Sequence, residues 1–127
     1  MNNLSGIYPP FSHLLQEFAP ARPDAGFRVD IEEDEKEYRI RADLPGVIKD
    51  NVSLNAEDNV LTVAAKFEES SENALRSERI SGEYSRSFRL PRIVDAQNIA
   101  ASMKNGVLTV SLPKAKTESA GRKIEIA

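Results

Sequence analysis

The chain has 127 residues, a formal net charge of −3 and no cysteine. This length suits one domain with extensions at its ends, and the missing thiols exclude disulfides and cysteine-ligated metals. Basic residues are scattered among acidic ones, unlike a surface that binds nucleic acid. No apolar run reaches the roughly 18 residues of a membrane span, and no secretory signal is visible. We therefore expect a cytoplasmic protein that binds neither nucleic acid nor membranes.

The first 26 residues hold four of the seven prolines and two of the six glycines, which indicates an N-terminal arm, residues 1–26, outside the main fold. The spacing of its apolar side chains predicts a short helix with one apolar face. Two helical turns do not persist alone in water, so this face is expected to dock. Its own domain and a separate apolar partner both remain open as docking sites. The face consists of Phe11, Leu14, Leu15 and Phe18.

Residues 27–113 alternate between apolar and polar side chains with a period of two, which predicts an all-β fold. The acidic run 32–35 is expected to form a solvated turn, and Pro45-Gly46 suits a type II turn. Asn105-Gly106 lies between two alternating runs and predicts a two-residue hairpin of type I′. The apolar positions of the expected strands begin at Phe27, Tyr38, Val52, Leu61, Tyr84, Ile99 and Leu108.

The polar stretch 68–82 is much longer than an ordinary hairpin loop. Within it, the segment 76–80 is predicted to form a short extra strand. Glu68, Glu69 and Glu72 keep the base of the loop in water. A disordered loop is the alternative interpretation.

Arg86 interrupts the apolar face of the expected strand 84–90. The alternation that points Phe88 and Leu90 into the core also points Arg86 inward. An unpaired inward charge would cost several kcal/mol, so its guanidinium requires a carboxylate or carbonyl partner, unless the side chain extends to the edge of the sheet. The partner can lie in the same chain or across an interface.

The C-terminal extension, residues 115–127, is polar until it ends in Ile124-Glu125-Ile126-Ala127. Two isoleucines two residues apart point the same way in an extended chain, so Ile124 and Ile126 form a paired apolar plug. The polar segment before them is a tether with a reach of about 30 Å. Such a long tether favours a groove on another subunit over one in the same chain.

The sequence lacks the parts of an enzyme. His13 is the only histidine, so one chain cannot assemble a Ser-His-Asp triad or a histidine-rich metal site. The six glycines are dispersed and form no phosphate-binding loop. Carboxylates cluster in the expected turns, where solvation explains them. We therefore expect no catalytic residue, no cofactor and no metal.

Four segments, in order, resemble the α-crystallin domain and tail of the small heat shock proteins, especially their bacterial, archaeal and plant members. Each segment alone is a weak signal, whereas four in order over most of the chain are specific. The turn segment resembles the end of the family's third strand, and the next two resemble its seventh and ninth strands. The segments are Ala42-Asp43-Leu44-Pro45-Gly46, residues 82–91, residues 105–114 and Ile124-Glu125-Ile126.

This resemblance implies an immunoglobulin-like β-sandwich over residues 27–114 that dimerises and then assembles into larger homo-oligomers. It places Arg86 at the dimer boundary, near acidic groups. The exchanged strand of the family matches Arg76, Ser77, Glu78, Arg79 and Ile80. Its acceptor on the partner subunit is expected at Phe27, Val29 and Ile31.

The resemblance also implies a function, the ATP-independent holding of unfolding client proteins. The arm residues Phe11, Leu14, Leu15 and Phe18 are expected to bind clients, although the arm is short for the family and lacks tryptophan. A β-sandwich adaptor or co-chaperone that holds no clients is the alternative. The tail plug is expected to enter a neighbour's groove between its fourth and eighth strands, at Val52, Leu54, Ile99, Ala101 and Met103.

Overall fold

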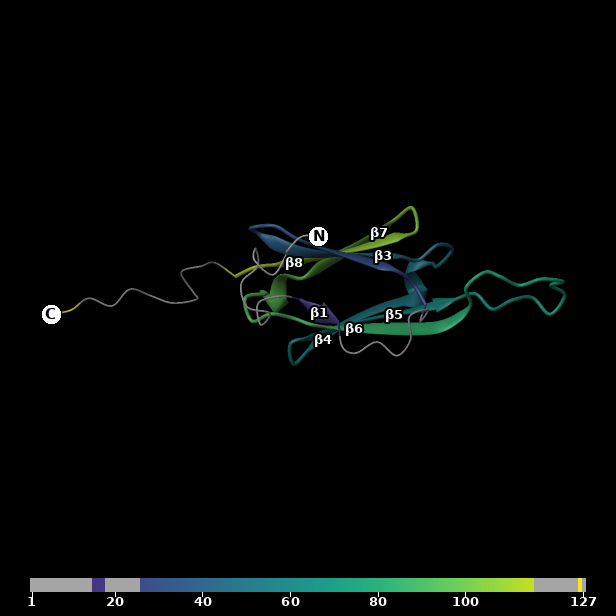
Figure 1. Ribbon diagram of the computed structural model, residues 1–127, viewed down its shortest axis with the longest axis horizontal. Coiled ribbons are helices and arrows are strands. Elements are labelled where there is room, and N and C mark those ends of the chain that lie inside the picture. Colours follow the sequence, from purple (N-terminus) through teal and green to yellow (C-terminus); the bar gives the residue numbers. More distant parts are fainter. Residues whose placement is uncertain (1–14, 18–25, 116–125, 127) are drawn as a thin grey trace, which may run out of the picture.

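Two four-stranded antiparallel sheets pack face to face in the computed structural model, which describes residues 15–17, 26–115 and 126 (Figure 1). This arrangement confirms the prediction of an all-β, immunoglobulin-like sandwich. Sheet A contains, from edge to edge, β1 (Gln16–Glu17), β6 (Gly82–Arg89), β5 (Val60–Phe67) and β4 (Val52–Glu57). Sheet B contains β2 (Val29–Glu33), β3 (Glu37–Asp43), β8 (Val107–Pro113) and β7 (Ala100–Lys104).

The core lies between the sheets and is built from alternate residues of the strands. In β5 and β8 every second side chain is buried, as the period-two pattern predicts. Val63, Val110 and Phe88 are fully buried. Burying each such side chain contributes about 1.5–3 kcal/mol, so these central strands hold the two sheets together. Two single-turn 3₁₀ helices connect the sheets, η3 (Lys49–Asn51) and η4 (Ala96–Asn98).

The two predicted glycine turns are present, whereas Glu32 and Glu33 of the predicted acidic turn belong to β2, which pairs them with β3. Asn105 and Gly106 both adopt positive φ, 52° and 78°, as a type I′ turn requires between β7 and β8. After β3, the N–H of Val47 donates to the carbonyl oxygen of Leu44 at 3.1 Å, an ordinary hydrogen-bond distance. Gly46 has φ 79° there, as the third position of a type II turn requires.

The predicted arm helix is wrong where the structure describes the arm. Gln16 and Glu17 form the short strand β1, which pairs with Arg89 and Phe88 of β6. Leu15, just before it, is 8% exposed and belongs to the core of its own domain. Edge pairing and burial of Leu15 therefore override the helical spacing. Phe11, Leu14 and Phe18 lie outside the described residues.

The segment between β5 and β6 also differs from the prediction. Residues 68–81 contain turns but no strand, so the extra strand at 76–80 is not formed within this single chain. Figure 1 shows the segment as a long loop that projects from one end of the sandwich. Leu75 in this loop is fully exposed. A strand needs a neighbouring strand for its backbone hydrogen bonds, and within the described part of the chain none pairs with this loop.

Candidate interaction site

Arg86 has the partners that its inward position requires. It lies directly opposite buried Val63 in β5, which confirms that its side chain is on the inner face. Nε donates to Oε2 of Glu17 at 2.7 Å, and Nη2 donates to Oε1 at 2.5 Å. Nη1 donates to the carbonyl oxygen of Phe27 at 2.7 Å. The guanidinium thus binds a carboxylate and a carbonyl of its own chain, and its hydrogen bonds to Glu17 raise the pKa of Arg86.

The chain enters the sandwich beside this ion pair through a glycine that no other residue can replace easily. Gly26 has φ 102°, and a Cβ built on it would lie 2.6 Å from Cγ of Tyr84 and 2.8 Å from its Cβ. The Tyr84 ring packs edge-on against Phe67, with centroids 6.0 Å apart. We call Glu17, Gly26, Phe27, Tyr84 and Arg86 the arm root.

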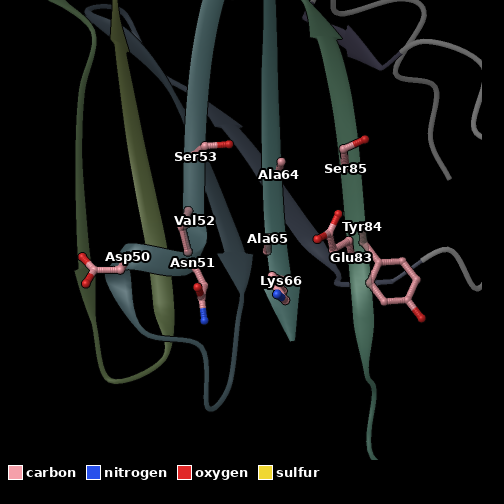
Figure 2. Close-up of a pocket in the computed structure, with 10 residues that line it drawn as sticks. All are labelled: Asp50, Asn51, Val52, Ser53, Ala64, Ala65, Lys66, Glu83, Tyr84 and Ser85. Atoms are coloured by element: carbon pink, nitrogen blue, oxygen red, sulfur yellow. The ribbon is translucent and has the colours of Figure 1, made fainter. Parts of the chain in front are cut away.

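The arm root identifies which sheet edges face each other. The Arg86 to Phe27 bond joins β6 to the start of β2, so the β6 side of sheet A lies over the β2 side of sheet B. The other two edges, β4 and β7, therefore share the opposite side of the sandwich. Figure 2 agrees, because the yellow-green strands lie on the β4 side of sheet A, beyond Val52 and Ser53.

The predicted groove residues lie along this shared side. Val52 and Leu54 face inward, opposite buried Ala65 and Val63, yet they are only partly buried. In β7, Ala101 pairs with buried Val110 but is itself exposed. Incompletely covered apolar side chains therefore lie at both edges, and we call them together the β4/β7 strip. It consists of Val52, Leu54, Ile99, Ala101 and Met103.

The predicted acceptor strand is also an edge. β2 pairs with β3 on one side only, so its other backbone edge has no strand partner among the residues that the structure describes. Ile31 is 41% exposed there, Val29 is partly buried, and Phe27 is 4% exposed. Ile80, at the end of the projecting loop, packs partly against the core. The predicted exchange residues thus lie on an open strand edge and in a loop without a strand.

The outer face of sheet B carries a charge network. Arg39 pairs with Glu37 and donates to Glu32 at 3.2 Å. The hydrogen bonds to Glu37 and then to Glu32 raise the pKa of Arg39. Arg41 pairs with Glu32 at 3.3 Å. These cross-strand pairs keep the face polar and hydrated, so it is not an apolar docking surface.

Sequence reasoning missed a shallow hollow on the outer face of sheet A (Figure 2). Ser53, Ala64 and Ser85 lie in a row across β4, β5 and β6, and their small side chains leave this space. The signal was available, since small residues occupy matching alternate positions of the three strands. The hollow carries no catalytic constellation. Among the residues that the structure describes, no group of three or more potential ligands is arranged to hold a metal.

A family model described as Hsp20/alpha crystallin family matches residues 30–127. The 18 kDa heat shock protein of Clostridium acetobutylicum is 46% identical over 110 residues, covering 81% of this chain and 72% of that protein. Small heat shock protein C4 of Rickettsia felis is 41% identical over 104 residues. That alignment covers 79% of this chain, but only 63% of the Rickettsia protein's length.

Solved structures of small heat shock proteins resemble this fold. A small heat-shock protein from Xylella fastidiosa superposes with a TM-score of 0.69 and 30% identity, covering 80% of this chain and 95% of that one. Heat shock protein 16.0 from Schizosaccharomyces pombe gives a TM-score of 0.65 and 32% identity, covering 80% of this chain and 98% of that one. The fold and these matches define an α-crystallin domain protein. The chain belongs to the Hsp20/alpha crystallin family, the small heat shock proteins.

Family membership bears on the other predictions. Small heat shock proteins are ATP-independent chaperones, so the chain is not an enzyme, in agreement with the sequence analysis. Among the residues that the structure covers, no helix is long and apolar enough to cross a membrane.

Proposed function

We propose that this protein is an ATP-independent holdase, which binds unfolding proteins and prevents their aggregation. The β4/β7 strip is the observation that carries the proposal. It presents half-covered apolar side chains beside two open strand edges, and such surfaces bind apolar segments exposed by unfolding proteins. Phe11, Leu14 and Phe18 of the arm add further apolar contacts with clients. Leu15 joins them only when it leaves the core.

The proposed holdase is built from dimers. In each dimer, residues 76–80 leave their own chain and add a strand to the open edge of β2 in the partner. Two features support this step, namely the absence of a strand within residues 68–81 and the exposure of Ile31 and Leu75. Arg86 already binds Glu17 within its own chain. We therefore assign Arg86 to the arm root, from which it adjoins the dimer boundary.

Dimers assemble further through the tail plug. Ile124 and Ile126 of one subunit enter the β4/β7 strip of a neighbour, which corresponds to the groove between the family's fourth and eighth strands. Ile126 is 96% exposed in the single chain, so it is available for such a contact. Plug and client compete for one apolar strip, and self-assembly keeps that strip covered and the protein soluble.

The holdase proposal is tested by light scattering of a heat-labile client at its aggregation temperature, without nucleotide. Scattering should fall as the protein is added and saturate at a defined ratio to the client. Leu54→Ser should weaken this suppression, because it places a hydroxyl in the β4/β7 strip. Asn55→Ser is the matched control, since Asn55 is the next residue of β4 and faces outward. Undiminished scattering at several-fold excess of folded protein would favour the adaptor alternative.

The assembly proposal is tested by native mass. Replacing Ile124 and Ile126 with alanine should leave dimers, because the plug loses most of its apolar area. Thr117→Ala with Ser119→Ala is the matched control in the same tail and should keep the native mass. An unchanged mass for the isoleucine variant would assign the tail to another role.

A further inference from the structure

Lys114, the residue directly after the last strand β8, is held from several sides. Nζ of Lys114 donates to Oε2 of Glu33 at 2.7 Å and to the carbonyl oxygen of Asp34 at 2.8 Å. The same amine lies 5.0 Å from the centroid of the Tyr38 ring, within cation–π range. The Lys114 side chain is only 15% exposed, although lysine usually remains in solvent. We call Lys114, Glu33, Asp34 and Tyr38 the tail clamp.

The acidic turn that receives Lys114 is held by hydrogen bonds of its own. Oδ1 of Asp34 accepts hydrogen bonds from the N–H groups of Lys36 at 2.8 Å and Glu37 at 2.9 Å. These bonds are the main reason that the pKa of Asp34 is lowered. The N–H of Asp34 in turn donates to the carbonyl oxygen of Glu37 at 2.9 Å. These bonds hold the carbonyl of Asp34 in place for the amine, and Glu33, the last residue of β2, supplies the carboxylate.

A second loop holds the opposite side of the chain at this point. The N–H of Ala115 donates to the carbonyl oxygen of Ile93 at 2.6 Å, and the N–H of Asp95 donates to the carbonyl oxygen of Pro113 at 2.8 Å. The N–H of Lys114 donates to the carbonyl oxygen of Lys36 at 2.8 Å. The chain therefore leaves the sandwich between two loops, and Lys114 is its side-chain attachment.

We propose that Lys114 is a positioning residue that fixes where the C-terminal tail leaves the domain and thereby raises the effective concentration of the tail plug at a neighbour's groove. Effective concentration depends on where a tether begins and how long it is. Without the side-chain attachment, only backbone hydrogen bonds hold residues 113–115 between the two loops. The segment then detaches more often, and each detachment lengthens the tether and displaces its origin. The proposal rests on the proposed function for its use of Ile124 and Ile126 as an assembly plug.

The direct test measures the position of the chain just after the tail clamp, without requiring assembly. The chain has no cysteine, so two introduced cysteines can be spin-labelled cleanly, one at exposed Asn55 and one at Thr117. The measurement uses the full chain with the Ile124→Ala and Ile126→Ala changes, mixed with an excess of unlabelled subunits. Lys114→Met keeps an aliphatic stem over Tyr38 but removes the charge. It should broaden the distribution of distances between the two labels, measured by pulsed electron resonance. Lys114→Arg keeps the charge and should return the distribution most of the way to its original narrow width.

The second test uses native mass against protein concentration, in chains that keep Ile124 and Ile126. Lys114→Met should raise the concentration at which half of the oligomer dissociates by about 3- to 10-fold, and Glu33→Gln should act in the same direction. Lys104→Met, which removes an exposed lysine at the other end of sheet B, should have no effect.

The outcomes separate this inference from the proposed function. A distance distribution that Lys114→Met leaves unchanged overturns the clamp, even if the isoleucine variant forms dimers as proposed. If the isoleucine variant keeps its native mass, the tail plug fails, and the role of Lys114 in raising plug concentration fails with it. Broadening of the distances would then establish only the attachment. A dissociation effect that persists in the isoleucine variant would indicate a dimer or folding defect and would also overturn the proposal.

Discussion

The two ends of the sandwich are held by different means. At the arm root, Arg86 binds both oxygens of Glu17 and the carbonyl oxygen of Phe27, and Leu15 and Phe27 are buried in the core. At the tail clamp, the amine of Lys114 contacts one carboxylate oxygen and one carbonyl oxygen. Its neighbours Pro113 and Ala115 are only partly buried. The arm root is therefore part of the fold, whereas the tail clamp is an attachment. Changes at the first should lower stability, and changes at the second should act mainly on assembly.

The largest effect is expected from Gly26→Ala. The substitution combines an unfavourable positive φ with a Cβ only 2.6 Å from Cγ of Tyr84, and that part of the side chain cannot move without its strand. We expect the free energy of unfolding to fall by about 3 kcal/mol, measured by urea titration. Gly82→Ala is a close control, because Gly82 also has positive φ, 92°, but no atom lies within 4 Å of its added Cβ. Equal losses at the two glycines would show that the contact with Tyr84 does not matter.

Tyr38, the aromatic member of the tail clamp, makes the stability of the fold depend on pH. Burial, followed by the charge and hydrogen bond of Glu33, raises its pKa from 10.0 to about 12. Unfolded chains therefore release the tyrosine proton first as the pH rises. Tyr38 therefore contributes about 2 to 3 kcal/mol to the free energy of unfolding below pH 10, and this stabilisation is lost as the pH rises through 12.

Urea titrations between pH 9 and pH 12 measure this loss. Tyr38→Phe should flatten the fall in stability across that range, because it removes the titrating hydroxyl while Glu33 and Lys114 remain. A slope that Tyr38→Phe leaves intact would mean that other groups cause the alkaline unfolding.

Arg86→Met tests the arm root directly, because it removes the guanidinium but keeps much of the side-chain volume. Glu17 would remain as a half-buried carboxylate without its cation, since the two side chains are 22% and 21% exposed. We expect a loss of about 2 kcal/mol in the free energy of unfolding, between the values typical of exposed and buried pairs. Arg86→Lys should recover only part of it, because an ammonium cannot bind both oxygens in a fixed plane.

The control for this prediction is Arg92→Met, which removes an exposed arginine and should change stability by less than about 0.5 kcal/mol. A double-mutant cycle with Glu17→Ala isolates the pair, because the combined loss should be smaller than the sum of the single losses. Additive losses would mean that Arg86 and Glu17 contribute independently.

The sequence predicted features whose causes are local. The strands follow from alternation, and the turns at Gly46 and at Asn105-Gly106 follow from positive φ. It failed where a distant or separate segment decides. The arm spacing suggested a helix, but β1 pairs with β6, more than 70 positions away at the Gln16 to Arg89 pair. The inward position of Arg86 was predicted, but its partner Glu17 is 69 residues away and could not be identified.

The tail clamp was missed for the same reason. Lys114 meets Glu33 at a separation of 81 residues, and the acidic run 32–35 was interpreted only as a solvated turn. No local pattern indicates which lysine in a polar segment is buried against a tyrosine. The loop 68–81 shows the opposite limit, since the strand predicted at 76–80 is not formed within the single chain, and we propose that a second chain supplies its neighbour.

The smallest effect on stability is expected from Lys114→Met, and it decides whether the two ends truly differ. The Lys114 and Glu33 side chains are 15% and 32% exposed, and the backbone bonds of Lys114 and Ala115 remain after the change. We expect the free energy of unfolding to fall by less than about 1 kcal/mol, roughly half the loss for Arg86→Met. Urea titration of both variants in the Ile124→Ala and Ile126→Ala background compares them without the contribution of assembly. A loss for Lys114→Met as large as that for Arg86→Met would make the tail clamp a part of the fold, like the arm root.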